Sequence, residues 1–219
     1  MFHHFHGKEH PQVQGSISKD DFENILNFIG LDNILTANKW YKKAKNNNLE
    51  QTDICITFDD GLKCQFDIAR PILNKYGLTA FYFFYTSIFT DNPSELEIYR
   101  NFRTTQYKNI DCFYDAFRDV LKQKEFYLKY KKRLNEFNPT EYLKKSPFYS
   151  DNDKWFRFLR DELLSKEQYD EIMNTLIKEK NYNISNVKDM IWMNKSDLIQ
   201  LKNEDNIIGL HTHHHPTNI

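Results

Sequence analysis

Glycine and proline are scarce in this chain of 219 residues, with six of each. Collagen-like and linker-rich architectures need far more of both residues, so these classes are excluded. Cysteine is also rare, and the three cysteines are too few and too widely spaced for a disulfide framework. That pattern fits a reducing compartment. Because the N-terminus also lacks the pattern of a signal peptide, we expect a cytoplasmic protein.

An excess of either charge is missing as well. Thirty basic side chains stand against thirty-one acidic ones, which gives a net charge of −1. Nucleic-acid-binding proteins carry a clear basic excess, so a nucleic-acid partner is excluded. The longest apolar run, residues 80–85, is far shorter than the roughly 18 residues of a membrane-spanning helix, so no membrane span is expected. The hydrophobic content of 40% is typical of a globular chain with a core.

A strand–helix–strand pattern lies in the first half of the chain. Residues 53–58 form a short apolar run rich in β-branched side chains, and residues 79–85 form a second run. Between them, residues 65–76 carry apolar side chains at helical spacing. This order is typical of a parallel βαβ unit and predicts an α/β fold. The segments 1–6 and 207–210 are further candidate strands.

The sequence pattern changes between residues 91 and 194. Charged and aromatic residues alternate there at helical spacing, with almost no strand pattern. We therefore interpret 91–194 as a helical insertion, and 1–90 together with 195–219 as the α/β core. The aromatic stripes of the insertion are interpreted as packing surface rather than as a cofactor site.

Three serines precede helical patterns and are expected to cap helices. They are Ser18, which has Asp21 three residues later as in a capping box, Ser165 and Ser196. Within the insertion one apolar stripe is clear. It consists of Ile110, Phe113, Tyr114, Phe117, Val120 and Leu121.

The first cluster of residues that could carry out chemistry is Thr-Phe-Asp-Asp-Gly at residues 57–61. Asp59 and Asp60 follow a predicted buried strand, which is where α/β folds place their active sites. Charges at such a position are costly unless they are solvated, paired or bound to a metal. The alternative interpretation is an ordinary turn in which an aspartate caps the next helix.

The second cluster is His211-Thr212-x-x-His215. Two histidines four residues apart can ligate the same metal ion, although a histidine-rich terminus without function is the alternative. Both clusters follow predicted strands, so a parallel sheet would bring them to one edge. An aspartate and two histidines fit Zn²⁺ or a similar divalent ion.

Together the two clusters resemble the polysaccharide deacetylases with a NodB-homology domain, carbohydrate esterase family 4. Residues 57–61 are identical to the first motif of that family, and residues 211–215 match its second motif, His-Ser/Thr-x-x-His. The similarity extends over residues 1–90 and 190–219. The resemblance implies an α/β fold built as a partial, distorted (β/α) barrel with a large helical insertion.

The resemblance also implies roles for the matched residues. Asp60, His211 and His215 would hold a divalent metal ion, with Zn²⁺ expected. Asp59 would act as the general base toward the attacking water. The substrate would be an N-acetylated amino sugar in a polysaccharide or a glycan precursor, and the enzyme would be a hydrolase of carbon–nitrogen bonds other than peptide bonds.

The family carries three later motifs, including a histidine that acts as general acid, and none of them is found up to Ile219. A second hypothesis is therefore a catalytically inactive truncated fragment, or an interaction protein derived from such a deacetylase. A third is an amidohydrolase of the same fold that acts on a small amide.

Other residues near the motifs have weaker signals. One of His3, His4 and His6 could line the site, but hydrogen-bonded structural roles are the favoured interpretation. Cys64 follows the aspartates closely, and we expect it to be a buried thiol rather than a ligand.

Overall fold

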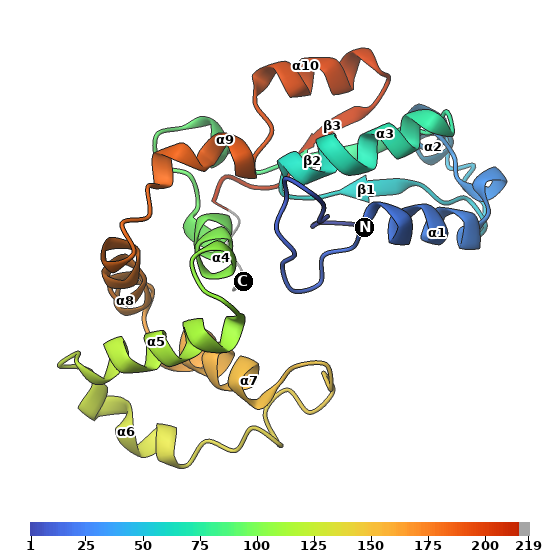
Figure 1. The fold of residues 1–219 in the computed structure, drawn as a ribbon. Helices are drawn as coiled ribbons and strands as arrows, with labels where there is room; N and C mark the ends of the chain where they lie inside the picture. The colour runs from blue at the N-terminus through green and yellow to red at the C-terminus, as the bar shows by residue number, and fades with distance from the viewer. Residues whose placement is uncertain (215–219) are drawn as a thin grey trace. The chain divides into compact units, whose positions relative to one another are not determined.

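The computed structural model of the protein describes residues 1–214 (Figure 1). The chain forms two compact units. We call Met1–Asn101 together with the segment that starts at Ile184 the sheet unit, and Phe102–Asn183 the helical unit. The first boundary falls inside helix α4 (Glu95–Thr105). The insertion of 91–194 into a deacetylase core stays a prediction, because these units are defined by packing alone.

The sheet unit is built on three parallel strands. Strands β1 (Ile56–Phe58), β2 (Ala80–Phe84) and β3 (Ile207–Leu210) pair in the order β1-β2-β3. Thr57 lies opposite Phe81 in the register. The expected α/β class is observed, whereas the barrel stays a prediction. Because all three strands point the same way, their carboxyl ends meet at one edge of the sheet (Figure 1).

The N-terminal segment differs from the strand expected over residues 1–6. Phe2 forms a single parallel bridge to Phe58, and Phe5 forms one to Ile17. The segment therefore changes its pairing partner after one bridge, and no continuous ladder with β1 develops. It still places the first residues of the chain directly beside β1.

Helices run beside the strands, as Figure 1 shows for α1 and α3. The helices of the sheet unit are α1 (Lys19–Ile29), α2 (Ala37–Lys45), α3 (Arg70–Lys75), α9 (Lys188–Ile191) and α10 (Lys195–Asn203). Shorter turns are the 3₁₀ segments Leu31–Asn33, Thr86–Phe89 and Ile184–Asn186, and the π-helical turn Gln65–Ala69.

Two of the predicted helix starts lie in the sheet unit. The capping box of Ser18 and Asp21 is confirmed at the start of α1. The cap predicted at Ser196 is wrong, because α10 begins after Asn194. The Asn194 side-chain oxygen accepts the backbone N–H groups of Ser196 and Asp197, and an asparagine is as good a cap as a serine.

An aromatic cluster forms the core beneath the strands. Phe22 from α1 packs edge-on against Phe2 and Phe5 of the N-terminal segment. Phe58 stacks on Tyr82 with ring centroids 4.7 Å apart. Because large aromatic side chains bury much area each and interlock in fixed geometries, this cluster gives the ends of the strands a rigid base.

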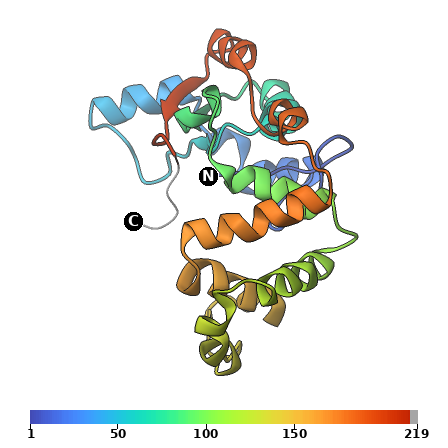
Figure 2. The same cartoon turned by 90° about the vertical axis from the view of Figure 1, so that its left-hand side faces the viewer.

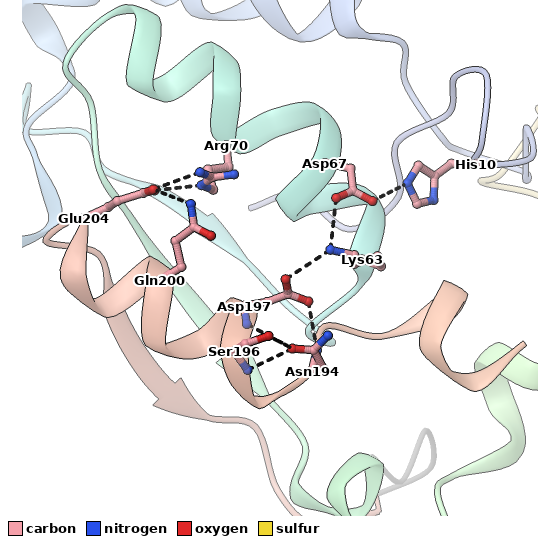
Figure 3. Close-up of polar contacts among 9 residues, drawn as sticks. All are labelled: His10, Lys63, Asp67, Arg70, Asn194, Ser196, Asp197, Gln200 and Glu204. Atoms are coloured by element: carbon pink, nitrogen blue, oxygen red, sulfur yellow. Dashed lines mark hydrogen bonds and ion pairs between the residues drawn. The ribbon is translucent and has the colours of Figure 1, made fainter.

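Two ion pairs attach α10 to the region around α3 (Figure 3). Arg70 donates two parallel hydrogen bonds to Glu204, at 2.7 and 2.9 Å. These two bonds are the main reason why the pKa of Glu204 is lowered to about 2. Lys63 bonds Asp197 at 3.1 Å. Since β3 follows α10 almost directly, both pairs help to fix where β3 begins.

The helical unit contains the helices that run from yellow-green to orange in Figure 2. They are α5 (Ile110–Lys122), α6 (Tyr127–Asn135), α7 (Asp151–Phe158) and α8 (Lys166–Glu179), with a π-helical turn at Leu159–Leu163. The predicted cap at Ser165 is confirmed by a capping box with Gln168. Five residues of the apolar stripe of α5 are buried as expected, namely Phe113, Tyr114, Phe117, Val120 and Leu121. Ile110, at the start of the helix, is exposed, so the stripe was predicted one residue too long. In residues 1–214, no helix combines the length and the apolar character that crossing a membrane requires.

Candidate active site

The candidate site lies at the carboxyl edge of the sheet. Asp59 and Asp60 directly follow β1, and His211 directly follows β3. The backbone N–H of His211 donates to the carbonyl oxygen of Phe84 at 2.7 Å, so the ladder between β2 and β3 extends to this histidine. Strand pairing therefore fixes the backbone of His211, a bond to the Phe2 carbonyl fixes that of Asp59, and Asp60 lies in the turn that follows.

Three of the four predicted site residues come together. The Nε2 atom of His211 lies 3.9 Å from Oδ2 of Asp59 and 3.9 Å from Oδ1 of Asp60. Both aspartates are buried, while the His211 side chain is 33% exposed. The carboxylates thus form the base of the site, and the imidazole lies nearer to solvent. The fourth predicted residue, His215, lies outside the described residues.

The backbone at this edge adopts a conformation that most residues avoid. Asp60 has φ 75° and Gly61 has φ 62°, and Thr212, next to His211, has φ 63°. A left-handed conformation at a non-glycine residue costs roughly 1–2 kcal/mol, and residues held in such conformations cluster at active sites and ligand-binding sites. A Cβ atom on Gly61 would lie 2.3 Å from the Phe84 ring, so both its φ and its packing require glycine here.

His3 joins the site, which corrects our expectation of a structural role. Its Nε2 atom lies 3.9 Å from Oδ2 of Asp59, and its side chain is 38% exposed. The cause is the bridge beside β1, since the backbone N–H of Asp59 donates to the carbonyl oxygen of Phe2 at 3.2 Å. In a parallel register, the residue after Phe2 lies beside the residue after Phe58. That register rests on one isolated bridge and leaves no pattern in the sequence, so sequence reasoning missed it.

The neighbouring histidines have the structural roles that we expected. The His4 ring bonds the buried carboxylate of Glu97 at 2.8 Å. The His6 ring bonds the hydroxyl of Ser16 at 2.9 Å. Because successive residues of an extended chain point to opposite faces, His3 and His4 serve different environments.

A buried tyrosine follows β2 at the same edge. The Tyr85 hydroxyl accepts a hydrogen bond from the indole N–H of Trp192 at 2.7 Å. Burial raises the pKa of Tyr85, and the negative charges of Glu97 and Asp60 raise it further. The hydroxyl is therefore neutral at physiological pH and adds no charge beside the aspartates. Sequence reasoning gave this residue no role.

Asp60 and His211 offer a divalent metal ion two donor atoms. Two ligand atoms of a tetrahedral zinc ion, each about 2.1 Å from it, lie roughly 3.4 Å apart. Asp60 and His211, at 3.9 Å, are therefore near that spacing and would have to approach each other slightly to share an ion. Carboxylate oxygen and imidazole nitrogen are also donors that zinc accepts. Among residues 1–214, no group of three or more His, Cys, Asp or Glu side chains is arranged to hold an ion. The pair fits as part of a site whose predicted third ligand is His215.

Cys64 is a buried thiol, as expected, and takes no place in the donor set. Burial raises its pKa to about 12, so it stays protonated at neutral pH. Its sulfur accepts the backbone N–H of Phe5 at 3.4 Å. Its role is therefore to hold the N-terminal segment.

Comparisons with known proteins found one partial similarity, to a deacetylase structure. No protein-family model matches the chain, and no curated protein matches it. Among solved structures it is similar to the deacetylase PplD of Streptococcus pyogenes in complex with acetate, with 25% sequence identity and a TM-score of 0.32. The match covers 40% of this chain and 42% of that chain, so the chain spans less than half the length of this neighbour.

Proposed function

We propose that this chain is a metal-dependent deacetylase that hydrolyses the N-acetyl group of an amino sugar in a polysaccharide or a glycan precursor. The observation that carries the proposal is the meeting of His211 with Asp59 and Asp60 at the edge of the sheet, with nitrogen–oxygen distances of 3.9 Å. The motif resemblance adds the reaction class and the substrate class. A chain of net charge −1 also accords with a neutral sugar substrate.

Asp60 and His211 are the described residues that would hold the metal ion, and His215 is the proposed third ligand. When bound, such an ion polarises an amide carbonyl and lowers the pKa of a coordinated water. The left-handed backbone conformation of Asp60 turns the chain just after β1, where the carboxylates of Asp59 and Asp60 lie. The strain at this residue is therefore consistent with a role in ligation.

Asp59 is proposed as the general base. Its carboxylate lies at the base of the site and faces the partly exposed imidazole of His211. A carboxylate in this position accepts a proton from the water that attacks the acetamide carbonyl. A positioned general base contributes about 10²- to 10⁴-fold to such a reaction.

His3 is proposed as the proton donor to the leaving amine. The departing nitrogen needs a proton, and a protonated imidazole is the side chain that most often supplies one in enzyme sites. The Nε2 atoms of His3 and His211 both lie 3.9 Å from the same carboxylate oxygen of Asp59, and the His3 side chain is partly exposed to solvent. In this arrangement Asp59 takes up a proton, while His3 delivers one to the amine. The chain thereby has a candidate for the general acid that the motif pattern alone did not supply.

Acetate release from N-acetylglucosamine oligomers tests the proposal. Chelator-treated protein, the same protein with zinc restored, and the variants His211→Ala and His214→Ala are compared. His214 is the matched control because it is an exposed neighbour of the same residue type. We expect acetate only after zinc is restored, loss of release in His211→Ala, and retention in His214→Ala. Folded, zinc-loaded protein that releases no acetate would contradict the proposal and favour the interaction-protein hypothesis.

A further inference from the structure

A fully buried amide lies directly behind the site. Gln65 has no exposed surface and is the first residue of the π-helical turn that precedes α3. Its side-chain nitrogen donates to the carbonyl oxygen of Asp59 at 2.6 Å and to that of His3 at 2.9 Å. One NH₂ group thus joins two segments that are far apart in sequence, at the two residues whose side chains face each other in the site.

The preceding residue supports the same attachment. Cys64 accepts the backbone N–H of Phe5, so consecutive residues hold the N-terminal segment at positions 3 and 5. A π-helical turn is rare and occurs frequently at functional sites. At Gln65–Ala69 its first residue carries the side chain that reaches back to Asp59.

We propose that Gln65 is a positioning residue that sets the distance between the His3 imidazole and the Asp59 carboxylate. This inference rests on the proposed function, because it assigns these two groups to acid and base roles. The chemistry requires an amide, since two carbonyl oxygens need two N–H hydrogens. A glutamate in its place would direct oxygen atoms at those carbonyls, and a methionine would fill the space without donating.

The kinetics of Gln65→Met distinguish a role in positioning His3 and Asp59 from a role in metal binding. Misplacement of reacting groups by about 1 Å costs on the order of 10²-fold, so we expect a kcat loss of about that size with KM nearly unchanged. Zinc affinity should stay at the wild-type value, because Gln65 bonds the carbonyl oxygens of His3 and Asp59 and not those of the proposed ligands Asp60 and His211. The matched control is Gln200→Met, which removes an exposed amide that bonds only Glu204 among the described residues. In a His3→Gln background the loss should shrink to about threefold or less, because contacting partners are not additive.

Hydrogen exchange provides a readout that needs no activity. The backbone N–H of Asp59, which bonds the carbonyl of Phe2, should exchange faster in Gln65→Met and at the wild-type rate in Gln200→Met. If Gln65→Met does not fold, Gln65→Asn, which keeps the amide but shortens its reach to the two carbonyls, is used for the same comparison. Unchanged exchange, or an equal kcat loss with and without His3, overturns the inference. If the wild-type protein releases no acetate, the proposed function fails, and the exchange result alone decides whether Gln65 holds the two segments.

Discussion

The two units each contain a buried aspartate, one with a structural role and one with a proposed catalytic role. Asp59 of the sheet unit is 7% exposed and Asp153 of the helical unit is 8% exposed. The Asp153 carboxylate accepts hydrogen bonds from the backbone N–H and the hydroxyl of Ser150 and from the hydroxyl of Tyr114. Its oxygens are therefore bonded to groups of the folded core. Asp59 instead faces two partly exposed imidazoles at 3.9 Å. Equal burial therefore has different consequences, which depend on whether the partners belong to the core or to a solvent-accessible edge.

Asp59→Ala tests the catalytic side of this comparison and has the largest expected effect. Loss of a general base should lower kcat for acetate release by about 10²- to 10⁴-fold. The free energy of unfolding should change little, since the ion pairs of Asp59 with His3 and His211 are long contacts to partly exposed imidazoles, and such pairs add little stability. Denaturant unfolding alongside the kinetics checks both parts. A large loss of stability would place Asp59 in the same category as Asp153.

Asp153→Ala is the matched variant in the helical unit. It removes the reciprocal half of a helix cap and leaves the buried Tyr114 hydroxyl without its acceptor, which together should cost about 3 kcal/mol. Metal-dependent acetate release per folded molecule should stay at the wild-type level. Thermal unfolding and hydrogen exchange within 102–183 measure the effect. A loss of kcat without a loss of stability would contradict the structural role of Asp153.

Gly61→Ala tests whether the site edge depends on its unusual backbone. The added Cβ atom meets the Phe84 ring and has to adopt a positive φ, so we expect a loss of about 2 kcal/mol or more. Gly15 also has a positive φ but has open space around its Cβ position, so Gly15→Ala is the control and should cost less. Equal losses at both positions would show that φ alone, and not the close packing on Phe84, sets the requirement.

Glu204→Gln has the smallest expected effect and a defined pH dependence. The ion pair with Arg70 lowers the pKa of Glu204 from its ordinary 4.5 to about 2. Its stabilisation is therefore complete above pH 4.5 and is lost as the pH falls toward 2. Water screens this partly exposed pair, so we expect about 1 kcal/mol at pH 7. Urea unfolding at several pH values should show the two proteins converging in acid, and a difference that persists at pH 2 would contradict this assignment.

Local patterns in the sequence were sufficient for the strands of the sheet and for most of the helices. The runs that became β1, β2 and β3 are short and apolar, and their direction follows from the helices between them. The capping box at Ser18 was also readable, because it depends on neighbours three residues apart. The proximity of Asp59, Asp60 and His211 followed from the same reasoning, since parallel strands end at one edge.

Contacts that depend on an isolated bridge or on one buried side chain could not be predicted in this way. The place of His3 depends on the bridge from Phe2 to Phe58, and the role of Gln65 depends on two carbonyls that meet only in the folded chain. Neither leaves a periodic or compositional signal. The wrong cap at Ser196 has a simpler cause, since Asn194 and Ser196 are both good caps and the local sequence does not rank them.

Zinc binding tests most directly whether the carboxyl edge of the sheet is a metal-dependent site. Calorimetric titration should compare wild-type protein with Asp60→Ala and with Asp189→Ala, an exposed aspartate of the same unit. We predict one zinc ion per wild-type chain, a loss of affinity of at least about 100-fold in Asp60→Ala, and wild-type affinity in Asp189→Ala. Zinc that binds Asp60→Ala as tightly as the wild-type protein would contradict the account.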